Sequence, residues 1–271
     1  MACGRNFFIL LFPLLGTVAA LVLTIVMMLG STEKASALHD VYYLKVDFSN
    51  ITTQAVLGTQ SDSLDSAAQS IINRLGVSNF YTTGISGFCR GDESGHYHDC
   101  ETPMIPYWFD LFGILRRDTN TENLNIELPE DVQNYENILR TASKVMWVFY
   151  IIAAALLVIE LVIGLCTFRS RIMSCCTAFV SFFATAFMVV ASGLGTGIHV
   201  VYRKYFNQEV NKYGISAEIG KNMMGLTWAA SGLCLWAFIW WLFAICCGNT
   251  KRSSRNRDME ETRPFIPNRR W

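Results

Sequence analysis

Long apolar segments alternate with polar segments along the chain. The apolar segments cover residues 7–29, 145–168, 172–202 and 223–247. Each is long enough to cross the roughly 30 Å hydrocarbon core of a bilayer as a helix. Lipid cannot hydrogen-bond the backbone, so a helix, which pairs its own backbone groups, is the expected structure. The pattern therefore predicts a membrane protein with four transmembrane helices.

The first apolar segment has a second interpretation as a signal peptide, because Ala35-Ser36-Ala37 looks like a small-residue cleavage site. The apolar region of a signal peptide is about 7–15 residues long. The run at residues 7–29 is longer than that, so we expect an uncleaved membrane helix.

The polar region at residues 30–144 is the only long one in the chain. In the run at residues 41–48, apolar and charged side chains alternate, as in a half-buried strand. Residues 80–88 are rich in aromatic and β-branched side chains and are expected to pair with this strand. Residues 61–75 carry apolar side chains near helical spacing and predict a short amphipathic helix. Residues 107–115 are either an interfacial helix or part of the core of this domain, since Trp and Tyr suit both positions.

The other polar segments are short. A helical pattern begins at Pro129 and continues into the second apolar segment, and the third apolar segment is long enough to continue past the membrane. The remaining polar segments are residues 1–6, a turn at 169–171, a connection at 203–222 and a tail at 248–271.

Composition and charge placement agree with a membrane protein and predict its orientation. Of the 271 residues, 52% are hydrophobic and 16% charged, and the net charge is zero, so bulk charge does not indicate nucleic-acid binding. Basic residues gather on the side of the two termini, whereas acidic residues outnumber basic ones in residues 30–144. By the positive-inside rule, both termini are cytosolic and residues 30–144 face outward. The glycosylation sequon at Asn50 then lies on the outer side, as glycosylation requires.

The nine cysteines fall into two groups. Cys89 and Cys100 lie in the long polar region, on either side of a glycine-rich acidic loop. The others lie in or beside apolar segments: Cys3, Cys166, Cys175, Cys176, Cys234, Cys246 and Cys247. This separation predicts a disulfide between Cys89 and Cys100, with a reactive or metal-binding pair as the alternative. The cysteines at the cytosolic boundary are either S-acylation sites or free buried thiols: Cys3, Cys166, Cys175, Cys176, Cys246 and Cys247.

Two histidines, His96 and His98, alternate within the loop between Cys89 and Cys100. On an extended segment they would point to the same side, where they would bind a divalent metal or titrate near neutral pH. The alternative is a solvated polar loop, because the spacing of strong metal ligands is missing.

Two features lie within the apolar segments. Glu160 is a carboxyl group in a membrane segment, and it is either protonated and bonded to a neighbouring helix or extended toward the cytosolic surface. Gly193 and Gly197 are four residues apart and predict close contact between the third helix and another helix. No catalytic triad, Cys/His pair or nucleotide-binding loop occurs in a convincing context, so we expect no enzyme activity, bound metal or cofactor.

The tail carries the basic residues Lys251, Arg252, Arg255 and Arg257 directly after the last apolar segment. Such a cluster attracts anionic lipids of the inner leaflet at about 1 kcal/mol per cation. Membrane lipids are therefore the expected partners.

Several motifs resemble known families. Gly84, Gly87, Cys89 and Cys100 resemble the glycine–apolar–glycine–x–Cys…Cys signature of the claudin-like superfamily, although Ser86 replaces an apolar residue and no Trp precedes Cys89. The runs VYYLKVD (41–47), FYTTG (80–84) and NMMGLTWA (222–229) are similar to the fungal Sur-seven/PalI family. The resemblance covers nearly the whole chain except the tail.

The claudin-like resemblance implies a membrane α-helical fold, in which a four-transmembrane-helix bundle carries an extracellular antiparallel β-sheet domain. The family resemblance implies a plasma-membrane protein of static cortical domains (eisosomes) that supports membrane organisation, cell-wall integrity and endocytosis. It also implies lateral association with other copies or with eisosome proteins. Some relatives assist ambient-pH signalling or calcium influx, so an accessory sensor or channel regulator is the alternative.

Overall fold

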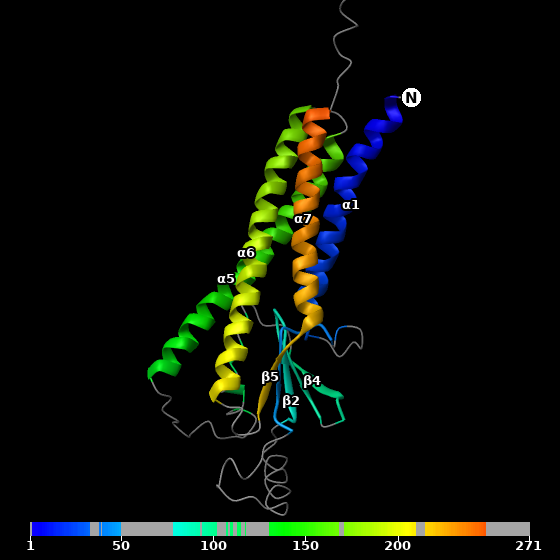
Figure 1. Ribbon diagram of the computed structural model, residues 1–271. Helices are drawn as coiled ribbons and strands as arrows, with labels where there is room; N and C mark the ends of the chain where they lie inside the picture. The colour runs from blue at the N-terminus through cyan, green and yellow to red at the C-terminus, as the bar shows by residue number, and fades with distance from the viewer. Residues whose placement is uncertain are drawn as a thin grey trace, which may run out of the picture.

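Four long helices form a bundle with a small sheet at one end (Figure 1). Our computed structural model describes residues 2–32, 38, 40–49, 78–92, 94–101, 107, 109–110, 113–114, 117, 130–167, 171–209 and 215–247. The helices are α1 (Ala2–Leu29), α5 (Glu130–Cys166), α6 (Arg171–Glu209) and α7 (Lys221–Cys247). Each helix is long and apolar enough to cross a membrane. Helix α5 begins before its apolar segment and helix α6 ends after its own, and the extension of α6 runs beside the sheet, with that of α5 on its far side (Figure 1).

The sheet is antiparallel throughout and combines strands from both polar connections. It contains β1 (Leu44–Asp47), β2 (Phe80–Thr83), β3 (Phe88–Gly91), β4 (Tyr97–Cys100) and β5 (Ser216–Ile219). The strand order is β4-β3-β2-β1-β5. The predicted fold of four helices and an antiparallel sheet is therefore confirmed.

Two details of the sheet differ from the sequence-based expectation. Residues 80–88 form two strands and not one, because the chain turns between Gly84 and Gly87, where the Gly84 N–H donates to the Gly87 carbonyl at 2.9 Å. The connection at 203–222 is more than a loop, because it supplies β5, which pairs along the whole of β1. Pairing of β1 with β2 agrees with the prediction, and the burial of Leu44 and Val46 matches the predicted alternation.

Side chains from the aromatic segment at residues 107–115 help to build the core under the sheet. Tyr107 and Ile114 are buried there against β-strand residues, and the Tyr107 hydroxyl lies 3.2 Å from Oγ1 of Thr83. This decides in favour of core packing over an interfacial helix for the residues of this segment that are described. The predicted helix at 61–75 lies outside the described residues.

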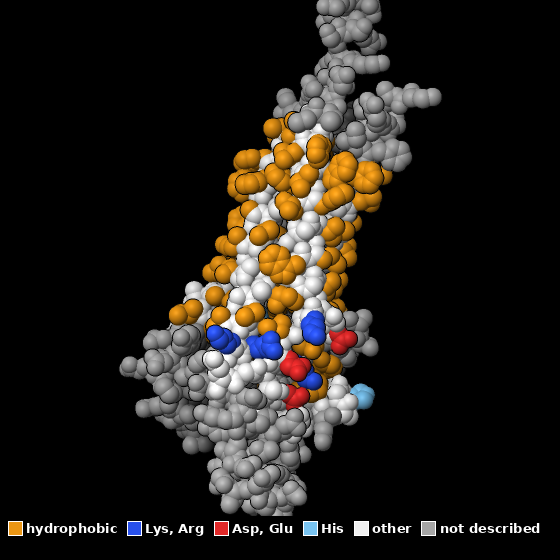
Figure 2. Space-filling view, viewed as in Figure 1, with side chains coloured by type: hydrophobic (Ala, Val, Ile, Leu, Met, Phe, Trp, Pro, Cys, Tyr) orange, Lys and Arg blue, Asp and Glu red, His pale blue; other side chains and the backbone are white. Residues whose placement is uncertain are grey.

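The bundle interior is built mainly from small and flexible apolar side chains. It contains Ala20, Met27, Met146, Ala153, Leu157, Ala184, Met188, Ala191, Met223 and Ala230. Alanines allow the helix backbones to approach closely, which is how helices associate where lipid removes the hydrophobic driving force. Hydrophobic side chains also cover the exposed flank of the bundle, whereas charged ones gather at the end that carries the sheet (Figure 2).

The expected close contact at Gly193 and Gly197 is not found among the described residues. A Cβ atom at either position would meet no heavy atom within 4 Å, and both glycines are exposed. The buried small residue on α6 is Gly195, where a Cβ would lie 2.7 Å from the Tyr43 hydroxyl and 3.1 Å from Sδ of Met146. Two residues correspond to about 200° of helical rotation, so Gly195 faces the bundle when its neighbours face away.

Candidate functional site at the sheet and its junction with the bundle

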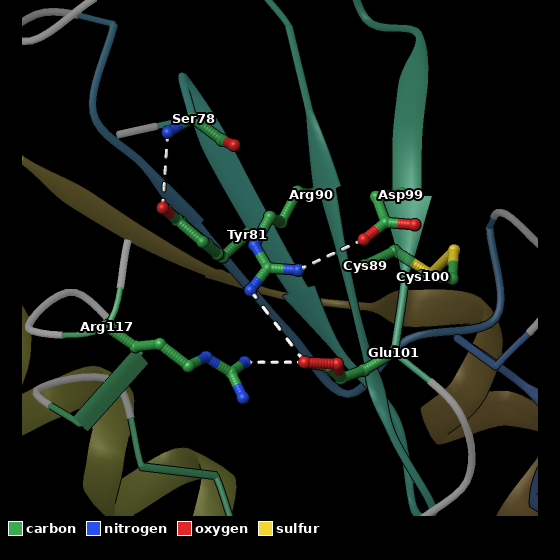
Figure 3. A network of polar contacts seen from close by, with 8 residues as sticks. All are labelled: Ser78, Tyr81, Cys89, Arg90, Asp99, Cys100, Glu101 and Arg117. Atoms are coloured by element: carbon green, nitrogen blue, oxygen red, sulfur yellow. Dashed lines mark hydrogen bonds and ion pairs between the residues drawn. A yellow bond between two sulfur atoms is a disulfide. The ribbon is translucent and has the colours of Figure 1, made fainter. Parts of the chain in front are cut away.

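A disulfide joins the edge strand β4 to its neighbour β3. Cys89 in β3 and Cys100 in β4 lie directly opposite each other, with their Cα atoms 4.1 Å apart (Figure 3). Cys89 is buried, at 1% exposure. The structure thus contains the predicted bridge, and the alternative of a reactive or metal-binding pair does not describe it.

The two motif glycines fix the sheet against the end of α1. A Cβ at Gly84 would lie 2.3 Å from the carbonyl oxygen of Gly30. A Cβ at Gly87 would lie 3.2 Å from the carbonyl oxygen of Ser31. Glycine is therefore needed because the backbone leaving α1 passes directly over the turn between β2 and β3.

A network of charged side chains lies beside the disulfide (Figure 3). Nη1 of Arg90 is 3.4 Å from Oδ2 of Asp99, and its Nη2 is 4.0 Å from Oε1 of Glu101. Arg117 donates to the same Glu101 oxygen at 2.6 Å. The network links β3, the end of β4 and the segment around Arg117. Because Asp99 and Arg117 are both largely exposed, the pairs Arg90–Asp99 and Arg117–Glu101 each contribute at most about 1 kcal/mol to stability.

The two loop histidines surround a single carboxylate. Nε2 of His98 is 3.4 Å from Oδ2 of Asp92, and the backbone N–H of His96 donates to Oδ1 of Asp92 at 2.9 Å. The Ser94 hydroxyl, the His96 N–H and the nearby imidazoles hold the pKa of Asp92 below its usual value. Among the described residues, no group of three or more His, Cys, Asp or Glu side chains is arranged to hold a metal ion.

A buried polar cluster, which the sequence reasoning missed, connects the sheet to the bundle. The Tyr43 hydroxyl lies 3.0 Å from the Tyr150 hydroxyl of α5 and 3.4 Å from Oγ1 of Thr227 in α7. The Tyr43 ring stacks on His199 of α6, with centroids 4.3 Å apart. Burial, with the neighbouring Tyr150, raises the pKa of the Tyr43 hydroxyl well above its usual value, so it remains a hydrogen-bond donor.

The same cluster continues into the membrane segments. Thr227 bonds Ser192, and Ser192 in turn lies 2.8 Å from the Ser231 hydroxyl. Hydroxyl-bearing residues inside apolar segments were the available sequence signal, because buried polar groups in lipid need partners. The cluster ties the segment before β1 to three helices and thereby sets how the sheet sits on the bundle.

The extension of α6 protects one edge of the sheet. The Asn207 amide donates to the Ala217 carbonyl at 3.2 Å and accepts from the Ala217 N–H at 2.9 Å. A side chain thus supplies to β5 the two hydrogen bonds that a further strand would supply, which reduces the tendency of this edge to pair with another chain.

Glu160 is bonded to neighbouring helices and does not extend to the surface. Its side chain is 1% exposed. Its Oε1 accepts from the Thr17 hydroxyl of α1 and from Nε1 of Trp241 in α7, each at 2.8 Å. The structure therefore shows the bonding to neighbouring helices that the first of the two expected arrangements contains.

The membrane-boundary cysteines are described only in part. Cys166, Cys175 and Cys176 are exposed, and Cys234 is buried. Cys3, Cys246 and Cys247 lie in helices, but their side chains are not among those described. The glycosylation site Asn50 and the basic residues Lys251, Arg252, Arg255 and Arg257 lie outside the described residues.

Comparison with known proteins points to one family. The sequence profile of the SUR7/PalI family matches residues 9–240. Protein PUN1 of Saccharomyces cerevisiae is 28% identical over 247 residues, which cover 88% of this chain and 91% of that protein.

Proposed function

Because the chain belongs to the SUR7/PalI family of membrane proteins, we propose that it organises the fungal plasma membrane laterally. In this role it is a structural, non-catalytic component of cortical domains (eisosomes) that supports membrane organisation, cell-wall integrity and endocytosis. The observation that best supports a structural role is the buried polar cluster around Tyr43. Its hydroxyl groups bond one another across the sheet and three helices, so the sheet is fixed on the bundle.

We base the proposed membrane contacts on the exposed cysteines and on the basic residues of the tail. Exposed thiols at Cys166, Cys175 and Cys176 lie at the helix ends farthest from the sheet, where S-acylation would anchor them in the inner leaflet. The tail cations would attract anionic lipid headgroups. The partners proposed are therefore anionic inner-leaflet lipids, other copies of this chain and eisosome proteins.

An accessory sensor or channel regulator is the second candidate, and one observation favours it. The exposed loop of β3 and β4 holds two imidazoles close to one carboxylate: Nε2 of His98 lies 3.4 Å from Oδ2 of Asp92, and the backbone N–H of His96 donates to Oδ1 of the same residue. Recruitment of a signalling partner after a shift to alkaline medium would support this candidate over the first.

We expect that replacing Lys251, Arg252, Arg255 and Arg257 by glutamine reduces the density and lifetime of cortical patches. Four cations at about 1 kcal/mol each would be lost from the lipid contact. The measurement is time-lapse imaging of a fluorescent fusion in the native cell. The matched control replaces four cations at the sheet end of the bundle, Lys144, Arg203, Lys204 and Lys221, and should leave patches unchanged. Normal patches in the tail variant would contradict the lipid-contact part of the proposal.

The proposed topology places the sheet outside the cell and both termini in the cytosol. If so, glycosidase treatment shifts the mobility of the wild-type protein but not of Asn50→Gln, because only a sequon that faces outward is glycosylated. Protease added to intact cells should leave an epitope at the C-terminus intact. Cleavage of that epitope without permeabilisation would overturn the topology.

A further inference from the structure

Glu160 occupies a position where a negative charge is costly. It lies on the core face of α5, and all four helices contribute to its surroundings: Thr17 from α1, Ser181 from α6, and Trp241 and Cys234 from α7. The described hydrogen-bond partners of its carboxyl group, Thr17 and Trp241, carry no charge. An isolated carboxylate in an apolar interior carries a large desolvation penalty and usually neutralises instead.

The hydrogen bonds identify the role of each carboxyl oxygen. The Trp241 indole can only donate, so Oε1 of Glu160, 2.8 Å away, must be an acceptor. The Thr17 hydroxyl approaches the same oxygen at 2.8 Å, although it also lies 2.9 Å from the Pro13 carbonyl. Oε1 is therefore the acceptor side of the carboxyl group.

The second oxygen is buried without a partner. Oε2 of Glu160 and the hydroxyl of Ser181 are both inaccessible, and neither makes a hydrogen bond to any described group. Ser181 lies beside the Glu160 carboxyl group. Because Oε1 already accepts two hydrogen bonds, the proton of a neutral Glu160 would lie on Oε2, and the Ser181 hydroxyl is the unpartnered group beside it that can accept this proton.

We propose that Glu160 is a proton-binding centre: it carries a proton on Oε2 and donates it to the Ser181 hydroxyl. A single neutral carboxyl group then links all four helices, since it accepts from Thr17 and Trp241 and donates to Ser181. Cys234 is the other titratable side chain beside it, and as a thiol it adds no charge that would oppose this state.

Infrared spectroscopy of the full-length protein in lipid nanodiscs tests this directly. Subtraction of the Glu160→Gln spectrum should leave a carbonyl-stretch band of a protonated carboxylic acid, from mildly acidic to mildly alkaline pH. Ser181→Ala should shift this band to higher frequency, because the acid proton loses its acceptor. Ser174→Ala, two helical turns away on α6 and also buried, is the matched control and should leave the band unmoved.

Carboxylate bands in place of the acid band at neutral pH would overturn the proposal. An acid band that is unaffected by Ser181→Ala would overturn the assignment of the proton to Ser181. If Glu160→Gln fails to fold, the comparison of wild type with Ser181→Ala and Ser174→Ala still decides, because an ionised Glu160 would give no shift in the acid region.

Discussion

Replacement of Cys89 by serine is expected to abolish delivery of the protein to the cell surface. The disulfide to Cys100 closes a short loop between neighbouring strands and stabilises the sheet by about 2–3 kcal/mol, mainly by restricting the unfolded chain. Cys89 is also buried, so the variant places a serine hydroxyl and an unpaired Cys100 thiol in or beside the core of a small domain. The remaining strands are short and would expose their edges to cellular quality control.

The measurement is surface labelling of a tagged protein, compared with total expression. Cys234→Ala is the matched control, because Cys234 is a free cysteine on α7, outside the sheet, and its loss leaves the disulfide unchanged. Cys100→Ser and the double variant should behave like Cys89→Ser, since each removes the same bridge. Reaction of Cys89 and Cys100 with an alkylating reagent before reduction of the native protein would show that the bridge is absent and that the explanation is wrong.

Substitution of Gly195 by leucine should reduce the yield of folded protein strongly, whereas the same substitution at Gly193 should be tolerated. A Cβ at Gly195 alone would lie 2.7 Å from the Tyr43 hydroxyl, so a larger side chain must displace the buried polar cluster. Overpacking of a core costs about 1–3 kcal/mol, and each hydrogen bond broken inside the cluster adds to this. Gly193 faces open space, so a leucine there only adds to the apolar outer surface.

Size-exclusion chromatography of a fluorescent fusion, followed by thermal unfolding, measures both effects. Equal damage from Gly193→Leu and Gly195→Leu would contradict the assignment of Gly195 as the buried position. Normal folding of Gly193→Leu together with a loss of cortical patches would instead favour contact between copies of the chain through this face, as lateral association requires.

Much of the fold could be predicted because it depends on local composition. A helix that crosses a bilayer requires a long apolar segment, so the sequence alone shows where the four membrane helices lie. The Cys89–Cys100 pair is visible because these are the two cysteines in the long polar region. The alternation at residues 44–47 predicts β1 because that strand has one buried face and one exposed face.

The parts of the site that were missed depend on contacts between distant segments. Strand β5 is a four-residue run, and only its pairing with β1, about 170 residues earlier, makes it a strand. Tyr43 precedes a strand, and nothing in its local sequence shows that its hydroxyl reaches Tyr150 and Thr227 in the membrane segments.

The sequence by itself determined which segments cross the membrane, which cysteines pair and that Glu160 needs a partner. Only the tertiary structure decided which face of each helix points inward, and therefore that Gly195 and not Gly193 is packed, and that Thr17 and Trp241 are the partners of Glu160. The physical reason lies in the solvent. In a water-soluble protein, the buried face of a helix is apolar and the exposed face is polar. In lipid the exposed face is apolar as well, so hydrophobic periodicity does not show which face is buried.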